Sequence, residues 1–587
     1  MKEFIVLAFL FWMPAFIVFI KNVLWDLYLW QLKEYRWDRF WVYIRWDQQE
    51  HNRAAGMIAI KFLLFTMVSL LFEFDLLAML GITLTFAIWF DQSVNFVYQL
   101  FSKKTRRPSF KNTRNLLIIG ILCIFYITIA FVFTAPFAVL DRNLDSYESF
   151  VSEVTPFKNE SGYYIYPDVY IFLGLATLIG ILIDLFTPFL VALGVALTYP
   201  FARFKRQLLI YKAKRYLRKT NPNLVIIGIT GSEGKTTTKE ILYEILSSKY
   251  KVAKTPYNFN SDVGIAKGIL QSVKKDTQIF IAEMGAYRKG EIKAVTKHFP
   301  PEISIVTSLD RQHIGIFGSK QKLFEAKSEI VQGLQKDGVA ILNADNELIR
   351  DMHELFSGKS IFITTSAKIF ENTIKKNDPE LTAMLIENVS SNKTALRFSI
   401  KTINEKVTFT IKHNTDHLVM NFALSIATAM ELNISLKDIA DTLKDLNIKL
   451  PRQEILKGDN ETTIINDTYN SSFNGFIAGV NMMNKIRKSK AQRIIICKGI
   501  YELGRYKKAT YAELIKKIGK NFDILISEDS LLAEIAKKNN TNALIFKYSK
   551  PDEALKLFWE NVNFGDVVLL EGRIHPSIIQ EIVKENE

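Results

Sequence analysis

The sequence has 587 residues, a formal net charge of +15 and a hydrophobic content of 49%. A chain of this length is too long for a single compact domain, since domains usually have about 100–200 residues. The two cysteines, Cys123 and Cys497, lie far apart, which excludes a disulfide framework and a zinc knuckle. The basic residues cluster beside apolar segments rather than in one long stripe, which favours a membrane surface over nucleic acid as the partner.

Apolar residues dominate the N-terminal third of the chain, in stretches long enough to cross a hydrocarbon core of about 30 Å. Five membrane spans are predicted, at roughly 4–25, 57–74, 76–99, 116–140 and 169–200. The basic clusters at 103–114 and 203–219 are expected on the cytoplasmic side, and the acidic stretch 141–168 on the outer side. This pattern predicts an integral membrane protein whose C-terminal half lies in the cytoplasm.

Four ionisable residues lie within or at the edges of these spans: Lys61, Glu73, Asp75 and Asp184. Such groups either mark a pathway through a membrane or extend their charge to its interface. We favour the second interpretation and assign no catalytic role to this part of the chain.

A different pattern begins after a basic helical linker at 203–221. The chain reads LVIIGIT and then GSEGKTTTKE, followed by the amphipathic sequence ILYEILSSKY. This is the order strand, glycine-rich turn, helix, in which backbone amides approach phosphate oxygens. Lys235 can reach the terminal phosphates, and the Thr236 hydroxyl can bind magnesium. The predicted nucleotide-binding loop consists of Thr230, Gly231, Ser232, Glu233, Gly234, Lys235, Thr236 and Thr237.

Two further apolar runs end in side chains that suit a metal ion. The run IFIAE places Glu283 at the carboxyl edge of a parallel sheet, beside the phosphate loop. The run ISIVTS is another such strand and brings Asp310 and His313 to the same edge. A histidine at this position does not by itself define a metal site.

The form TGxxGKTT, in the context GITGSEGKTTTKE, resembles the Mur ligase family, and the similarity continues from about residue 222 to the end of the chain. The segment TPYNFNSDVG is similar to the asparagine-rich loop of that family, and IFIAEMG to its strand ending in a magnesium-binding glutamate, here Glu283. The resemblance also implies that His313 helps to hold a second magnesium ion.

Other segments extend the resemblance. FEAKSEI is similar to the helix whose lysine is carbamylated by carbon dioxide, which implies that Lys327 becomes an anionic metal ligand. GVAILNAD is similar to the strand and turn near the adenine, with Asn343 as a base contact. The residues at 451–452 begin the hinge into the last domain, and the resemblance implies that Arg452 contacts the nucleotide phosphates. His417 and Asn421 keep the spacing of a helix-opening signature of the family.

The last domain resembles the branch of the family that adds D-alanyl-D-alanine. TIINDTYNSS is similar to its D-S/T-Y-N-A-N-P element, which places Asp467, Tyr469 and Asn470 at the nucleotide. YELG is similar to its E-L-G turn, and GDVVLLEGR to its closing strand. The chain departs from the pattern at Ser471 and Ser472, which replace alanine and asparagine, and at Glu571, which replaces a lysine.

The resemblance implies an ADP-forming carboxylate–amine ligase of bacterial cell-wall precursor synthesis that uses ATP and two magnesium ions. ATP would phosphorylate a carboxylate, and an amino acid or dipeptide amine, most simply D-alanyl-D-alanine, would attack the acyl phosphate. The predicted catalytic residues are Lys235, Glu283, His313 and Lys327, and the predicted metal ligands are Thr236, Glu283, His313 and Lys327. Nucleic acid is not expected as a partner.

The expected fold is an α-helical transmembrane bundle followed by α/β domains. The central domain would be a P-loop Mur ligase domain with a doubly wound parallel sheet, and the C-terminal domain a smaller Rossmann-like one. The predicted boundaries are 1–202 for the membrane domain, 203–221 for the linker, 222–450 for the central domain and 451–587 for the last. ATP is expected in the cleft between the last two domains, and 381–412 is expected to form a small antiparallel insertion.

The sequence leaves the donor and the function of the chain open to other interpretations. The membrane spans stand where soluble relatives have a UDP-sugar-binding domain, which favours a lipid-linked or membrane-proximal donor over a free UDP-linked one. The chain could instead be a membrane-anchored nucleotide sensor or scaffold, or a ligase for an acceptor outside peptidoglycan. Lys327 distinguishes a sensor from an enzyme, because a sensor has no need of a carbamylated lysine.

Overall fold

The structure is a computed structural model. It describes residues 2–32, 35, 60–61, 63–67, 75–101, 112–140, 157–158, 164–165, 167–256, 259–309, 317–392, 395–412, 418–445, 454–468, 471–487, 491–500, 503, 506–539 and 542–583. The chain forms two compact units, Met1–Lys205 and Arg206–Glu587.

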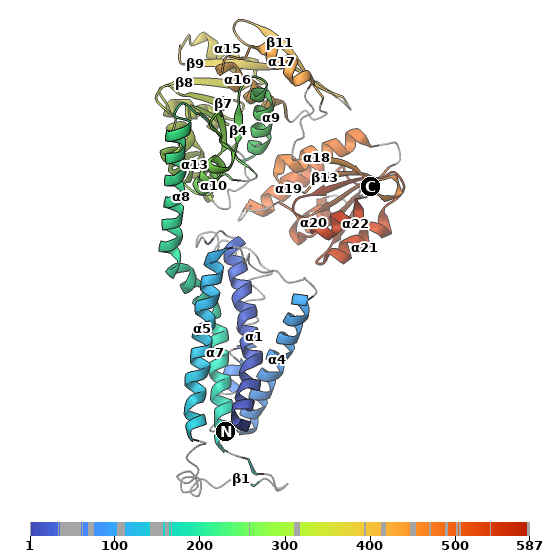
Figure 1. The fold of residues 1–587 in the computed structure, drawn as a ribbon. Helices are drawn as coiled ribbons and strands as arrows, with labels where there is room; N and C mark the ends of the chain where they lie inside the picture. Colours follow the sequence, from blue (N-terminus) through green and yellow to red (C-terminus); the bar gives the residue numbers. More distant parts are fainter. Residues whose placement is uncertain are drawn as a thin grey trace. The chain divides into compact units, whose positions relative to one another are not determined.

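Long apolar helices make up most of the described N-terminal unit (Figure 1). They are α1 (Lys2–Leu32), α4 (Asp75–Phe101), α5 (Thr113–Leu140) and α7 (Pro167–Leu197), and α8 (Tyr199–Thr220) follows them. The short strands β1 (Phe157–Lys158) and β2 (Tyr164–Ile165) pair antiparallel. The helices pack around a shared apolar core that includes Val23, Trp30, Ile118, Phe172 and Val191.

Within the described residues, three segments are long and apolar enough to cross a membrane: Trp12–Gln31, Thr113–Thr134 and Phe172–Thr220. They overlap the predicted spans 4–25, 116–140 and 169–200. The predicted span 76–99 is helical, as α4, but is not among these three, and most of 57–74 lies outside the described residues. Of the five predicted spans, the structure therefore supports three by length and composition.

Two of the ionisable residues in this unit pair with each other. Lys61 Nζ lies 3.0 Å from Asp184 Oδ1, and Asn22 of α1 donates a hydrogen bond to the same oxygen at 2.5 Å. Both charged side chains are largely buried. The two charges neutralise each other, and the expectation that they lie at a membrane interface stays a prediction.

The larger sheet of the second unit has nine strands in the order β11-β10-β9-β8-β7-β6-β3-β5-β4. The strands are β3 (Val225–Thr230), β4 (Val252–Lys254), β5 (Ile279–Glu283), β6 (Ile303–Val306), β7 (Val339–Asn343), β8 (Lys359–Thr364), β9 (Leu381–Ser391), β10 (Leu396–Lys401) and β11 (Lys406–Ile411). Neighbours from β4 to β9 run parallel, and β9, β10 and β11 pair antiparallel. The antiparallel strands expected at 381–412 are present, and they extend one edge of the main sheet.

Helices cover both faces of this sheet, as a doubly wound fold requires. One apolar core packs α8, α10 (Asp262–Ser272), α11 (Glu291–His298), α13 (Lys320–Gln332) and α15 (Ala367–Lys375). The other core packs α9 (Lys235–Ser247), α16 (Val419–Glu431) and α17 (Leu436–Asp445). The short helices α14 (Glu347–Arg350) and η1 (Asp351–Leu355) follow β7. Ile210 and Ala213 of α8 are buried in the first core, so the segment predicted as a linker packs in part with this unit.

The smaller sheet has six strands in the order β12-β13-β17-β14-β15-β16. They are β12 (Glu454–Lys457), β13 (Thr463–Asp467), β14 (Arg493–Cys497), β15 (Ile524–Ser527), β16 (Leu544–Lys547) and β17 (Val567–Glu571). Only the β12–β13 pairing is antiparallel among them. Its helices are η3 (Asp459–Glu461), α18 (Phe473–Ile486), α19 (Lys507–Ile518), α20 (Ser530–Asn539), α21 (Pro551–Asn561) and α22 (Pro576–Ile582). The prediction of a smaller parallel α/β domain is confirmed.

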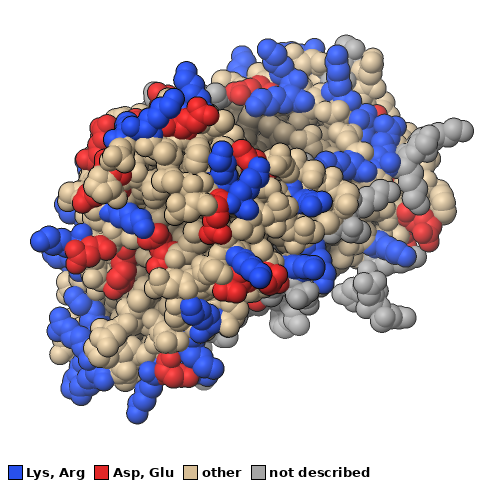
Figure 2. Space-filling model, turned by 90° about the horizontal axis from the view of Figure 1, so that it is seen from above, with Lys and Arg blue, Asp and Glu red and all other residues tan. Residues whose placement is uncertain are grey.

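Basic and acidic side chains are mixed on the surface that Figure 2 shows. Lys and Arg lie next to Asp and Glu over much of this face. Ion pairs such as Lys359–Glu431 and Lys406–Glu387 in the second unit are of this kind. The visible face therefore differs from the continuous basic stripe that follows a nucleic-acid backbone.

Candidate active site

The glycine-rich turn after β3 passes very close to its neighbours. Gly231 and Gly234 have φ angles of +149° and +79°. A Cβ atom on Gly231 would lie 2.0 Å from Thr307 Oγ1, and one on Gly234 would lie 2.4 Å from Asn421 Nδ2. The turn therefore needs glycine at both positions, for its backbone conformation and for its space.

Helix α9 begins directly after this turn without a side-chain cap. The amides of its first turn point toward the open end of the helix, where a partial positive charge favours phosphate. Lys235 Nζ folds back over the turn and donates to the carbonyl oxygens of Gly231 and Ser232 at 2.8 and 3.1 Å. These contacts keep the ammonium group beside the place where the phosphates of a nucleotide would bind.

Residues after β6 hold the turn in place. The backbone N–H of Ser232 donates to Ser308 O, and that of Glu233 donates to Ser308 Oγ, both at 2.8 Å. The Thr307 hydroxyl donates to Glu233 O. Thr307 and Ser308 were not predicted as site residues, since their role depends on the approach of two strand ends.

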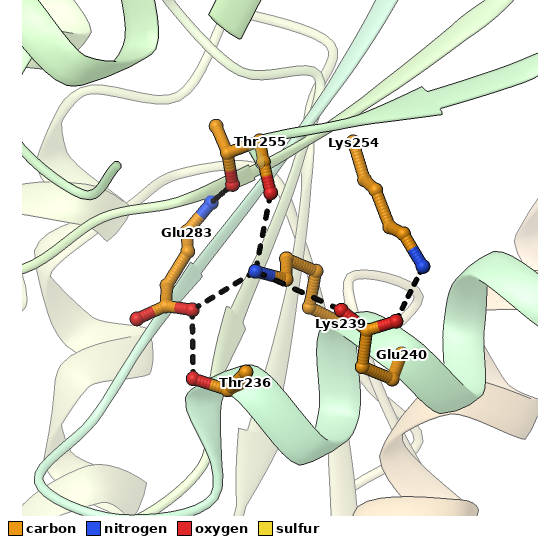
Figure 3. Close-up of polar contacts among 6 residues, drawn as sticks. All are labelled: Thr236, Lys239, Glu240, Lys254, Thr255 and Glu283. Carbon is orange, nitrogen blue, oxygen red and sulfur yellow. Dashed lines mark hydrogen bonds and ion pairs between the residues drawn. The ribbon is translucent and has the colours of Figure 1, made fainter. Parts of the chain in front are cut away.

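Glu283 ends β5, is almost fully buried and faces the start of α9 (Figure 3). Its Oε2 accepts a hydrogen bond from Thr236 Oγ1 at 2.9 Å, and its backbone N–H donates to Thr255 Oγ1 at 3.1 Å. The structure thus brings two predicted magnesium ligands together. Hydroxyl and carboxylate oxygens are the ligands that magnesium prefers, so the residues present fit that ion.

Binding of a metal ion at this site would require the nucleotide. Among the described residues, no group of three His, Cys, Asp or Glu side chains forms a metal centre. An ion beside Thr236 and Glu283 would complete its shell with phosphate oxygens and water, as magnesium usually does in nucleotide sites. His313, predicted for the second ion, lies outside the described residues.

Lys239 also contacts Glu283, and the sequence reasoning missed it. Its side chain is 1% exposed, and its Nζ lies 3.4 Å from Glu283 Oε2 and 3.2 Å from Thr255 O. The available signal was its spacing. Lys239 comes three residues after Thr236 and four after Lys235, which places all three on one side of a helix.

Lys327 lies on α13 and is 1% exposed. Its Nζ is 3.5 Å from Ala286 O. Burial, and then the positive charge of Lys235, hold the pKa of Lys327 well below its ordinary value, although Glu291 and Glu283 oppose this shift. Lys235, Glu283 and Lys327 are therefore close enough to act on one another electrostatically, and a larger fraction of Lys327 is neutral at a given pH than of an exposed lysine.

The other predicted residues have different positions. Asn343 ends β7, and its Nδ2 donates to Thr307 O at 2.8 Å, so its amide ties two strand ends together and its contact with adenine stays a prediction. Thr230 and Thr237 are buried beside the turn. Arg452, Tyr469 and Asn470 lie outside the described residues.

A second cluster lies at the carboxyl edge of the smaller sheet. Asp467 ends β13 and pairs in register with Glu571 of β17, which pairs in turn with Cys497 of β14. All three side chains are buried. Burial, with a further contribution from the Glu571 carboxylate, raises the pKa of the Cys497 thiol to about 12. A carboxylate thus stands beside Asp467 where the family pattern has a lysine, and the predicted nucleotide contact of Asp467 stays a prediction.

A parallel sheet whose strand β3 runs into a glycine-rich turn and an uncapped helix defines a nucleotide-binding α/β protein. Residues 229–429 match the Mur ligase middle domain.

Two proteins similar to this chain carry the same name. The "UDP-N-acetylmuramoyl-tripeptide--D-alanyl-D-alanine ligase" of Bacillus subtilis is 29% identical over 377 residues, which are 64% of this chain and 78% of that protein. The protein of the same name from Borreliella burgdorferi is 28% identical over 351 residues, which are 59% of this chain and 71% of that one.

Solved structures share the fold. MurF from Acinetobacter baumannii superposes with a TM-score of 0.56 at 23% identity, over 65% of this chain and 81% of that one. MurF from Thermotoga maritima in complex with ADP gives a TM-score of 0.54 at 22% identity, over 64% of this chain and 83% of that one.

The first prediction concerns the turn. We expect Gly234→Ala to weaken binding of a fluorescent ATP analogue at least tenfold, because the new Cβ would collide with Asn421. Gly565→Ala is the control, since Gly565 has a similar φ of +78° and nothing within 4 Å of the new Cβ. Both variants bear the backbone strain of about 1–2 kcal/mol, but only the first blocks the turn. Equal nucleotide affinity in the two variants would contradict this reading of the site.

The second prediction concerns the pKa of Lys327. Because this pKa is lowered by folding, the unfolded chain binds the proton more tightly, and stability rises with pH up to the ordinary value of 10.5. Lys327→Met removes this dependence. In bicarbonate-free buffer the variant should melt at a higher temperature than the parent near pH 7, and the difference should shrink toward pH 10. A difference that stays constant with pH would show that Lys327 is not held neutral by folding.

Proposed function

We propose that this chain is an ATP-dependent, ADP-forming ligase that adds D-alanyl-D-alanine to the peptide of UDP-N-acetylmuramoyl-tripeptide in peptidoglycan synthesis. Its relatives in Bacillus subtilis and Borreliella burgdorferi carry that name. One observation carries the proposal for this chain: the phosphate loop, the Glu283 carboxylate and the buried Lys327 amine meet at a single edge of the central sheet.

The residues at this edge have separate tasks. ATP supplies the phosphoryl group that activates the donor carboxylate toward an amine. Lys235 and the first amides of α9 bind the phosphates, and Lys235 exchanges its contacts with the turn carbonyls for phosphate oxygens. Thr236 and Glu283 hold magnesium, which offsets the charge on the transferred group. No side chain has to act as a nucleophile, so positioning carries most of the catalysis.

We further propose that Lys327 is carbamylated. Its neutral amine can attack carbon dioxide, forming an N–C bond and releasing one proton. The product is an anion, which would attract the positive charge of Lys235 and would add oxygen ligands for a second magnesium ion.

Carbamylation predicts a specific signal. The full chain, incubated with isotope-labelled bicarbonate, should give a carbamate carbonyl resonance by NMR, and Lys327→Met should lose it. Lys322→Met on the same helix is the control, because Lys322 is exposed. A carbamate signal that survives in Lys327→Met, or is missing from the parent at high bicarbonate, would exclude this role for Lys327.

The N-terminal unit is proposed to anchor the enzyme in the bacterial cytoplasmic membrane. Three of its segments have the length and apolar character of spans, and α8, which forms the end of the last of them, carries exposed basic and aromatic residues. Lys and Arg next to a span favour the cytoplasmic side. An anchored ligase would meet donors at the membrane, which favours a lipid-linked tripeptide as an alternative to the soluble UDP-linked one.

A donor assay tests the function and the choice of donor together. The full chain in membranes is given ATP, D-alanyl-D-alanine and either the UDP-linked or the lipid-linked tripeptide, and phosphate release and ligated product are measured. We expect ligation with at least one donor, and a loss of roughly a hundredfold or more in Glu283→Gln, the size typical of removing one group that stabilises the transition state. ATP binding without ligation of either donor would favour a sensor instead.

A further inference from the structure

Lys239 lies in the centre of the polar contacts around Glu283 (Figure 3). It belongs to the first turns of α9 and is among the largest fully buried side chains of the chain. Its Nζ contacts Glu283 Oε2 at 3.4 Å, Thr255 O at 3.2 Å and Glu240 Oε1 at 3.8 Å. Burying a lysine is costly unless its charge is paired, so this position needs its acidic neighbours.

The contacts divide the two oxygens of Glu283. Oε2 receives both Thr236 Oγ1 and Lys239 Nζ, whereas the other oxygen points away from Lys239 (Figure 3). The terminal torsion of a glutamate is broad and roughly two-fold, so a carboxylate does not fix its own orientation. Contacts on Oε2 therefore determine where the second oxygen points.

Thr236 has two tasks in the proposed site. Its hydroxyl oxygen is itself a proposed magnesium ligand, so it has to serve the ion as well as the carboxylate. Lys239 has no such second task among the roles proposed above. It also ties Glu283 to Thr255, the residue whose hydroxyl accepts the Glu283 backbone N–H.

We propose that Lys239 is a positioning residue that holds Glu283 Oε2 and so directs the other carboxylate oxygen to the metal of the bound nucleotide. This inference rests on the proposed function. Lys239 touches neither substrate nor metal in this scheme and acts through Glu283. The positive charge of Lys239 also repels a nearby cation, so a purely electrostatic role predicts that removing Lys239 tightens metal binding. A positioning role predicts the opposite.

The test measures metal binding directly. Manganese is titrated into the full chain in the presence of a non-hydrolysable ATP analogue, and free manganese is followed by electron paramagnetic resonance. We expect Lys239→Met to weaken manganese binding about 10–100-fold, the usual effect of losing a partner that orients a metal ligand. Binding of the analogue without metal should stay unchanged, because the described contacts of Lys239 are with Thr255, Glu283 and Glu240.

Lys254→Met is the matched control. Lys254 pairs with Glu240, as Lys239 does, and lies over the ring of Tyr243, but its described contacts do not include Glu283. Its side chain is also partly exposed. This variant should keep the metal affinity of the parent. Equal loss in the two variants would show that the Glu240 pairing, and not the orientation of Glu283, is what matters.

Two further measurements distinguish a failure of the proposed role of Lys239 from misfolding of the variant and from a failure of the proposed function. Thermal unfolding without metal reports whether Lys239→Met folds, and Lys239→Gln replaces it if that variant is unstable, with the same weakening expected. In the Glu283→Gln background, Lys239→Met should have no further effect on metal binding. Parent-like or tighter manganese binding by a folded Lys239 variant would overturn the proposal. Failure of the parent itself to bind manganese with nucleotide, or to ligate, would count against the proposed function instead.

Discussion

The register of three parallel strands determines where every group of the site lies. Ile229 of β3 pairs with Glu283 of β5, and Thr230 pairs with Val306 of β6. A slip of one residue between β3 and β5 would turn the Glu283 side chain to the opposite face of the sheet. A similar slip between β3 and β6 would separate Thr307 and Ser308 from the turn that they hold. The apolar residues of these strands, buried on both faces, fix the register and therefore the site.

Three ionisable side chains are buried at this edge of the central sheet, although burying charge lowers the stability of a fold. Lys239, Glu283 and Lys327 are each nearly inaccessible to solvent, and taking ions out of water costs free energy that pairing does not always recover. Lys239 and Glu283 offset each other, whereas the cost of burying the Lys327 charge lowers the pKa of its amine. A dry, preorganised set of charges is what phosphoryl transfer requires, because fixed dipoles and ions act more strongly there than in water.

Sequence patterns within single segments predicted those parts of the site that lie within one segment. The turn with Gly231 and Gly234, the helix that follows it and the strand ending in Glu283 follow from apolar runs and glycine spacing, and the structure has all of them. Thr307, Ser308 and Lys239 were missed because their contacts depend on how α9 meets the ends of β5 and β6. The strands at 381–412 were expected, but their place at the edge of the main sheet depends on pairing with β8, which is distant in sequence. The long apolar helices of the N-terminal unit were predicted by hydropathy, while the Lys61–Asp184 pair in that unit was not.

The central claim is that one metal ion, bound with the nucleotide, lies between Thr236 and Glu283. Anomalous scattering from manganese in crystals of the full chain with a non-hydrolysable ATP analogue would test it most directly. We expect a manganese peak within bonding distance of Thr236 Oγ1 and a Glu283 carboxylate oxygen, beside phosphates held by the turn at 231–234. A peak bound elsewhere, with Thr236 and Glu283 still joined only to each other, would contradict it.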